Sequence, residues 1–203
     1  MKWPKVIISA VVLGVYCGLI KVVPFLKNTS FQDIDIMFEW WWLFAIILIV
    51  NCDKWYEASL KTFVFFLISQ PLIYLVQVPF YRGGWQIFMY YKYWFIITLL
   101  TLPGAAVGFL LKKKNWLSAL VLAVPVAYMG WGFIYYFHSC TIHFPYHLLS
   151  SLSCLGMAGL FDYALLDDKK QKIFEAAVFV IVAAASIVYY FVIPHEYVVY
   201  SVR

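Results

Sequence analysis

Three histidines and a cysteine lie close together in the last third of the chain, and their side chains are well suited to hold a metal ion. They are His138, Cys140, His143 and His147. His143 and His147 are four residues apart, so on a helix both would project from one face. Imidazole and thiolate are ligands that zinc and copper accept. The spacing gives a candidate metal site formed by His138, His143 and His147.

Two features of the same stretch favour a purely structural role. Pro145 stands between His143 and His147, and no nearby carboxylate completes a ligand set. The chain also lacks the Gly-x-Ser-x-Gly, His-Glu-x-x-His and phosphate-binding-loop patterns of common enzymes. Whether the chain is an enzyme is therefore left open, and no cofactor is assigned beyond a zinc or copper ion at the histidines.

Aromatic residues give a second candidate site, for a small organic molecule. Tyrosine and tryptophan offer a flat apolar surface and one hydrogen-bonding group, which suits an uncharged ring ligand. These residues are dense at one end of several apolar segments, although a belt at the membrane interface would give the same pattern. The predicted ligand-binding residues are Glu39, Trp41, Trp42, Arg82, Trp94 and Tyr135.

Ionisable residues are absent from the middle of every apolar segment. Proton pumps and ion-coupled carriers usually keep such a residue inside the helical bundle. Ser69, Gln70 and Pro71 come closest to a polar site at mid-membrane depth. The pattern argues against ion-coupled transport and favours an uncharged ligand.

The composition places all of these residues in a membrane. Of 203 residues, 65% are hydrophobic and 12% are charged, whereas soluble domains carry about 25% charged residues. The chain shows no linker or repeat, so residues 1–203 are predicted to form one all-α transmembrane bundle. The net charge of +5 comes from short basic connections between apolar segments, and no nucleic-acid partner is expected.

About seven membrane-spanning helices are predicted, and six are possible because the second segment is short. A span needs roughly 20 apolar residues. The segments lie at about 5–26, 36–52, 59–79, 92–111, 115–137, 146–166 and 173–193.

Lysine positions predict the orientation. The two densest basic clusters, 112–114 and 169–172, fall on the same side of a seven-helix arrangement. Short cytoplasmic loops are enriched in lysine and arginine. The N-terminus is therefore predicted to be cytoplasmic and the C-terminus outside, in a bacterial cytoplasmic membrane.

Small residues predict where helices pack. Gly14 and Gly18, with Ala10 one turn earlier, form a stripe on the first segment. Because lipid is as apolar as a leucine side chain, helices in a membrane associate where small residues allow close backbone approach. The stripe is predicted to contact another helix, and Gly156, Ala158 and Gly159 offer a similar surface in the sixth segment.

The size, aromatic content and small-residue first segment are similar to those of the substrate-binding subunits of energy-coupling-factor vitamin transporters. The resemblance is one of build and implies a small-molecule binding or transport subunit with an outward-facing aromatic pocket. A partner membrane subunit or ATPase would supply the energy, because the chain has no nucleotide-binding motif. The alternatives are a membrane-embedded enzyme that uses the His/Cys cluster and a scaffold or immunity-type protein that binds a partner.

Overall fold

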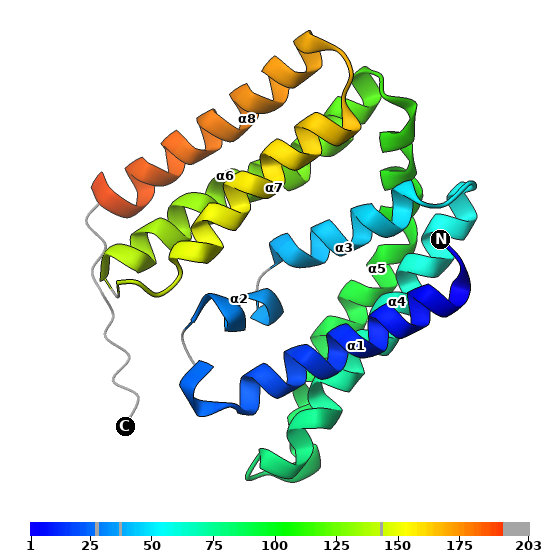
Figure 1. The fold of residues 1–203 in the computed structure, drawn as a ribbon, viewed down its shortest axis with the longest axis vertical. Helices are drawn as coiled ribbons and strands as arrows, with labels where there is room; N and C mark the ends of the chain where they lie inside the picture. The colour runs from blue at the N-terminus through cyan, green and yellow to red at the C-terminus, as the bar shows by residue number, and fades with distance from the viewer. Residues whose placement is uncertain (27–28, 37, 143, 193–203) are drawn as a thin grey trace.

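The computed structural model describes residues 1–26, 29–36, 38–142 and 144–192, and these residues contain helices and no strand (Figure 1). The α-helices are α1 (Trp3–Val22), α2 (Ser30–Ile36), α3 (Phe38–Val50), α4 (Trp55–Gln77), α5 (Tyr91–Gly108), α6 (Trp116–Ile142), α7 (Leu148–Leu165) and α8 (Lys169–Ile187). Shorter turns are η1 (Pro24–Leu26), η2 (Val78–Phe80), η3 (Gly84–Tyr90), η4 (Phe109–Lys113) and the π-helical η5 (Val188–Val192).

Six helices in the described part of the chain are long and apolar enough to cross a membrane. They are α1, α4 with η2, α5 with its flanking turns, α6, α7, and α8 with η5. The chain thus has the architecture of a multi-pass membrane protein. A seventh span is not confirmed, because the predicted segment 36–52 contains only the 13-residue helix α3. Such a helix is about 20 Å long, shorter than the roughly 30 Å hydrocarbon core.

The six long helices form two groups of three (Figure 1). Helices α1, α4 and α5 make one group, and α6, α7 and α8 make the other. Helix α3 lies between them and contacts α4, α5 and α6, while α2 bridges α1 and α7. The short α2–α3 unit therefore joins the two groups.

The close packing of α1 against α4 confirms the prediction made for the small-residue stripe. A Cβ atom added at Gly14 would lie 2.7 Å from the backbone oxygen of Ser69, and one at Gly18 would lie 2.7 Å from Cβ of Val76. These distances leave room for hydrogen only. In the second group of small residues, Ala158 is buried in the core, whereas a Cβ at Gly156 or Gly159 meets nothing within 4 Å.

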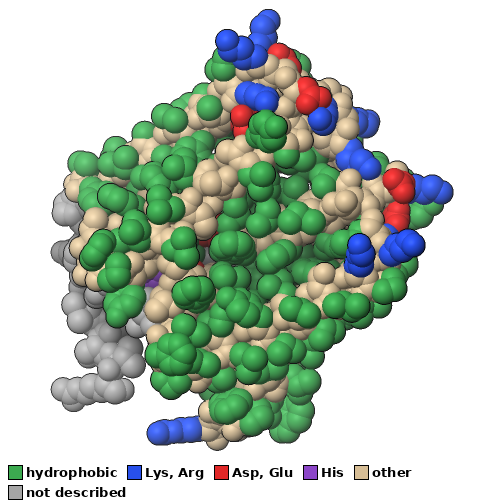
Figure 2. All heavy atoms as spheres, in the orientation of Figure 1, with side chains coloured by type: hydrophobic (Ala, Val, Ile, Leu, Met, Phe, Trp, Pro, Cys, Tyr) green, Lys and Arg blue, Asp and Glu red, His purple; other side chains and the backbone are tan. Residues whose placement is uncertain are grey.

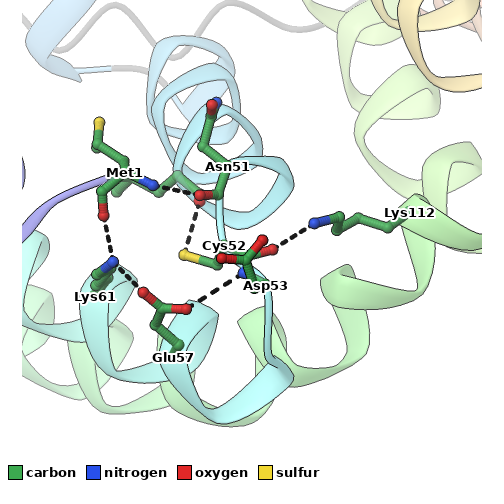
Figure 3. Close-up of polar contacts among 8 residues, drawn as sticks. Met1, Asn51, Cys52, Asp53, Glu57, Lys61 and Lys112 are labelled. Atoms are coloured by element: carbon green, nitrogen blue, oxygen red, sulfur yellow. Dashed lines mark hydrogen bonds and ion pairs between the residues drawn. The ribbon is translucent and has the colours of Figure 1, made fainter.

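Polar contacts tie the N-terminus to the α3–α4 connection (Figure 3). The amino group of Met1 donates to the carbonyl of Asn51, and the ammonium of Lys61 donates to the carbonyl of Met1 and to Glu57. The C-terminal end of α3 therefore lies at the level of the N-terminus.

The two lysine clusters lie at this same end of the molecule. Lys112 donates to the carbonyl of Cys52 at 2.5 Å, and Lys114 pairs with Asp167, just before α8, at 2.8 Å. Figure 2 shows most of the visible charged side chains gathered at this end, in the upper right of the view, while hydrophobic side chains cover most of the remaining surface. Residues 112–114 and 169–172 therefore lie at one end of the molecule, and which side of a membrane this end faces stays a prediction.

This grouping gives a testable topology. Cysteines introduced at two exposed lysines (Lys113→Cys and Lys170→Cys) should both react with a membrane-impermeant maleimide only after the cells are permeabilised. The four native cysteines are buried, so their background should be low. Arg82→Cys, in an exposed turn at the opposite end, is the control and should react in intact cells. Labelling of positions 113 and 170 from different sides would contradict the topology.

Candidate functional site

A cavity of about 640 Å³ lies among α3, α4, α5 and α6. Its walls combine aliphatic side chains with the rings of Phe38, Trp41, Trp42, Phe66 and Trp94. The Trp41 ring centroid lies 5.6 Å from that of Phe66 and 6.5 Å from that of Trp94. These separations allow tilted ring packing. Ligand-binding pockets commonly measure about 300–1,000 Å³, so the space suits a small organic molecule or part of a lipid.

The cavity opens sideways between α5 and α6. Leu100 and Val107 of α5 and Leu120 and Val124 of α6 line it, yet each is more than half exposed. The two helices make few contacts with each other. Each also has a proline at the cavity, Pro103 or Pro125, and internal prolines bend helices. The rim thus faces the region that lipid tails occupy around a membrane bundle.

Four polar side chains line the cavity, and two of them lack a partner. The hydroxyl of Thr98 donates to the carbonyl of Trp94 at 2.8 Å, and that of Thr101 donates to the carbonyl of Thr98 at 2.6 Å. By contrast, Nε2 of Gln70 and Oγ1 of Thr62 are buried without a hydrogen bond. A buried donor without an acceptor costs about 1–3 kcal/mol. A bound molecule with an acceptor oxygen would remove that penalty.

Three of the six predicted ligand-binding residues, Trp41, Trp42 and Trp94, line this cavity. The other three lie elsewhere. Arg82 is exposed beyond η2, Tyr135 stacks on Trp131 with ring centroids 5.1 Å apart, and Glu39 contacts α7. The structure therefore groups the predicted tryptophans and separates the predicted polar residues from them.

The cavity-lining residues of α4 are not among the ligand-binding residues predicted from the sequence. Thr62, Phe66 and Gln70 follow each other at four-residue intervals, so they share one face of the helix. Gln70 stood out in the sequence only as a polar residue in an apolar segment. The spacing was visible, but nothing in the sequence indicated that this face meets a cavity.

The histidines of the predicted metal site have separate partners. His138 stacks on Tyr190 with centroids 5.4 Å apart, whereas Nδ1 of His147 lies 2.8 Å from Oδ2 of Asp33. His143 lies outside the described residues. Among the residues that the structure does describe, no group of three or more His, Cys, Asp or Glu side chains could hold a metal ion.

The His147 contact belongs to a polar cluster between α2 and α7. The hydroxyl of Ser150 donates to the same Asp33 oxygen at 2.5 Å, and the backbone N–H of Ser150 donates to the hydroxyl of Ser30 at 3.2 Å. Serine, histidine and aspartate are thus together, but Ser150 donates to Asp33 and not to His147. A serine nucleophile needs the histidine as its base, so the observed arrangement fixes α2 to α7 and does not form such a pair.

A second carboxyl group lies deeper, among α3, α6 and α7. Oε1 of Glu39 accepts a hydrogen bond from the thiol of Cys154 at 3.6 Å, and Tyr136 is a further hydrogen-bonding neighbour. A Cβ at Gly132 would lie 3.3 Å from the same oxygen. The other oxygen, Oε2, is buried without a partner. Helix α3 therefore carries cavity-lining tryptophans and a buried acid.

Together, the fold and cavity define a multi-pass membrane protein with an apolar internal site. Comparisons of the chain with protein families, curated proteins and solved structures find no match. The cavity and the side chains around it are therefore the features that bear on function.

Proposed function

We propose that the protein binds an uncharged, mainly apolar molecule in the cavity among α3, α4, α5 and α6, as the binding subunit of a membrane transport system. The observation that carries this proposal is an aromatic cavity whose wall includes the unpartnered donor of Gln70. The proposed setting is a bacterial cytoplasmic membrane with the N-terminus inside. A partner subunit supplies the energy for transport.

The lining supports an uncharged ligand. The described residues around the cavity include no charged side chain, and an unpaired charge in an apolar site is costly. The rings of Trp41 and Trp94 offer stacking surfaces, and Gln70 offers two N–H donors. The proposed ligand combines an apolar body or ring with at least one carbonyl, ether or hydroxyl oxygen.

The exposed rim supports entry from the bilayer between α5 and α6, in place of the outward-facing entrance that the sequence suggested. An apolar molecule partitions into lipid before it binds, so a side opening lets it reach the site without crossing water. The unpartnered groups on α4 then lie on the wall away from this rim and hold the polar end of the ligand.

The proposal is tested by the molecules that copurify with the protein from its native membrane. Native mass spectrometry and analysis of a solvent extract should find one apolar compound at near-stoichiometric occupancy. Gln70→Leu removes both donors with little change in volume and should raise the dissociation constant about tenfold, which corresponds to about 1.4 kcal/mol and lowers the copurified amount.

Gln77→Leu is the matched control on the same helix. The Gln77 amide donates to the carbonyl of Ile73 and does not line the cavity, so occupancy should stay at the wild-type level. Equal occupancy in wild type and Gln70→Leu would contradict the assigned role of Gln70. The absence of any enriched compound would contradict the function itself.

A further inference from the structure

The carboxyl group of Glu39 lies well inside the bundle, although the residue stands at the start of its apolar segment. It contacts Cys154, six residues into α7, and the position of Gly132, ten residues before the end of α6. At 1.5 Å per residue these positions are about 9 and 15 Å from the helix ends. Helix α2 precedes α3 and binds α7 nearer its end, through Asp33, so α3 begins at depth.

The part of the chain that the structure describes places no positive charge around Glu39. Its exposed fraction is 1%. The ionisable groups that face it are Asp33 of α2, Tyr128, Tyr135 and Tyr136 of α6 and Cys154 of α7. Among the described residues, no lysine or arginine forms an ion pair with it. The five neighbours named above are neutral or negative at neutral pH.

An ionised carboxylate at this position would be strongly unfavourable, because it has lost its hydration and has no cation in exchange. The neutral acid avoids that cost. It also requires no counter-ion. We propose that Glu39 is a proton-binding site inside the bundle, occupied at neutral pH and exchanging with the end of the molecule where His147 lies.

Polar side chains lie between Glu39 and that end. The His147 side chain is 20% exposed and contacts Asp33. The Tyr136 ring stacks on the His147 ring with centroids 6.0 Å apart, and its hydroxyl is a hydrogen-bonding neighbour of Glu39. Imidazole, carboxyl and phenol groups all carry protons between neighbours. This inference does not depend on the occupant of the cavity.

Infrared spectroscopy of the purified protein tests the site directly, because the C=O stretch of a protonated carboxylic acid is separate from the bands of carboxylates. The spectrum of wild type minus that of Glu39→Gln should show a protonated-acid band at neutral pH. Glu57→Gln should not remove this band, because Glu57 is a partly exposed acid paired with Lys61. Glu39→Asp keeps a carboxyl group and should show an acid band at a shifted frequency. This second variant tests the assignment even if Glu39→Gln fails to fold.

The pH dependence adds a second readout. Raising the pH should remove the band as Glu39 ionises. Asp33→Asn removes a neighbouring negative charge and should move the midpoint of that loss to lower pH. A wild-type spectrum without the protonated band at neutral pH, or a band unaffected by both Glu39 substitutions, would overturn the proposal. Neither result would bear on ligand occupancy of the cavity.

Discussion

Replacing Gly14 with leucine (Gly14→Leu) should lower the free energy of unfolding of the detergent-solubilised protein by about 3 kcal/mol. The new Cβ would lie 2.7 Å from the backbone oxygen of Ser69 and 2.8 Å from Cβ of Leu72. The Ser69 atom belongs to the main chain of α4 and cannot rotate away. The helices must then separate, and the buried contacts of Val6, Ala10 and Cys17 weaken along with the one at Gly14.

Gly159→Leu is the matched control for this experiment. A Cβ at Gly159 meets nothing within 4 Å, so a leucine there adds apolar surface without a clash. Thermal unfolding of both variants in the same detergent, followed by circular dichroism, makes the comparison. Gly14→Leu should unfold several degrees below wild type, and Gly159→Leu should remain close to it. An equal effect of the two substitutions would mean that the α1–α4 contact is not close.

Filling the cavity should have the largest effect on ligand binding. Gly104 of α5 lines the cavity, and a Cβ at this position meets no atom within 4 Å. The backbone therefore accepts a side chain, and Gly104→Trp places a large ring in the space that the ligand would occupy. Occupancy by the copurified compound should fall at least about tenfold, whereas the helix should not be weakened, because glycine is a poor helix former.

Gly156→Trp is the control for the effect of adding a tryptophan outside the cavity. Gly156 of α7 has the same open surroundings but does not line the cavity. Occupancy in this variant should equal that of wild type, and the unfolding temperatures of the two tryptophan variants should be similar. Full ligand occupancy in Gly104→Trp would show that the compound binds elsewhere on the protein.

The long apolar runs determined much of the architecture from the sequence alone. Every hydrocarbon-spanning helix must be apolar and satisfy its own backbone hydrogen bonds, so hydropathy is a strong signal for such helices. Gly14 and Gly18 also identified a contact correctly, since only small residues allow two backbones to approach so closely. The short second segment was the exception, because its apolar run did not show that the chain forms α2 and α3 separately.

The site depended on the tertiary structure. In a soluble helix the apolar stripe marks the buried face, but lipid accepts apolar side chains as readily as a protein core does. Gly14 and Gly156 therefore look alike in the sequence, although one packs against α4 and the other faces open space. In the same way, no local pattern shows that one face of α4 lines a cavity. Asp33 and His147 are 114 positions apart, and no local pattern links them. The depth of Glu39 was likewise set by the position of α2, because a residue's distance from the end of its own segment does not give its distance from the end of the bundle.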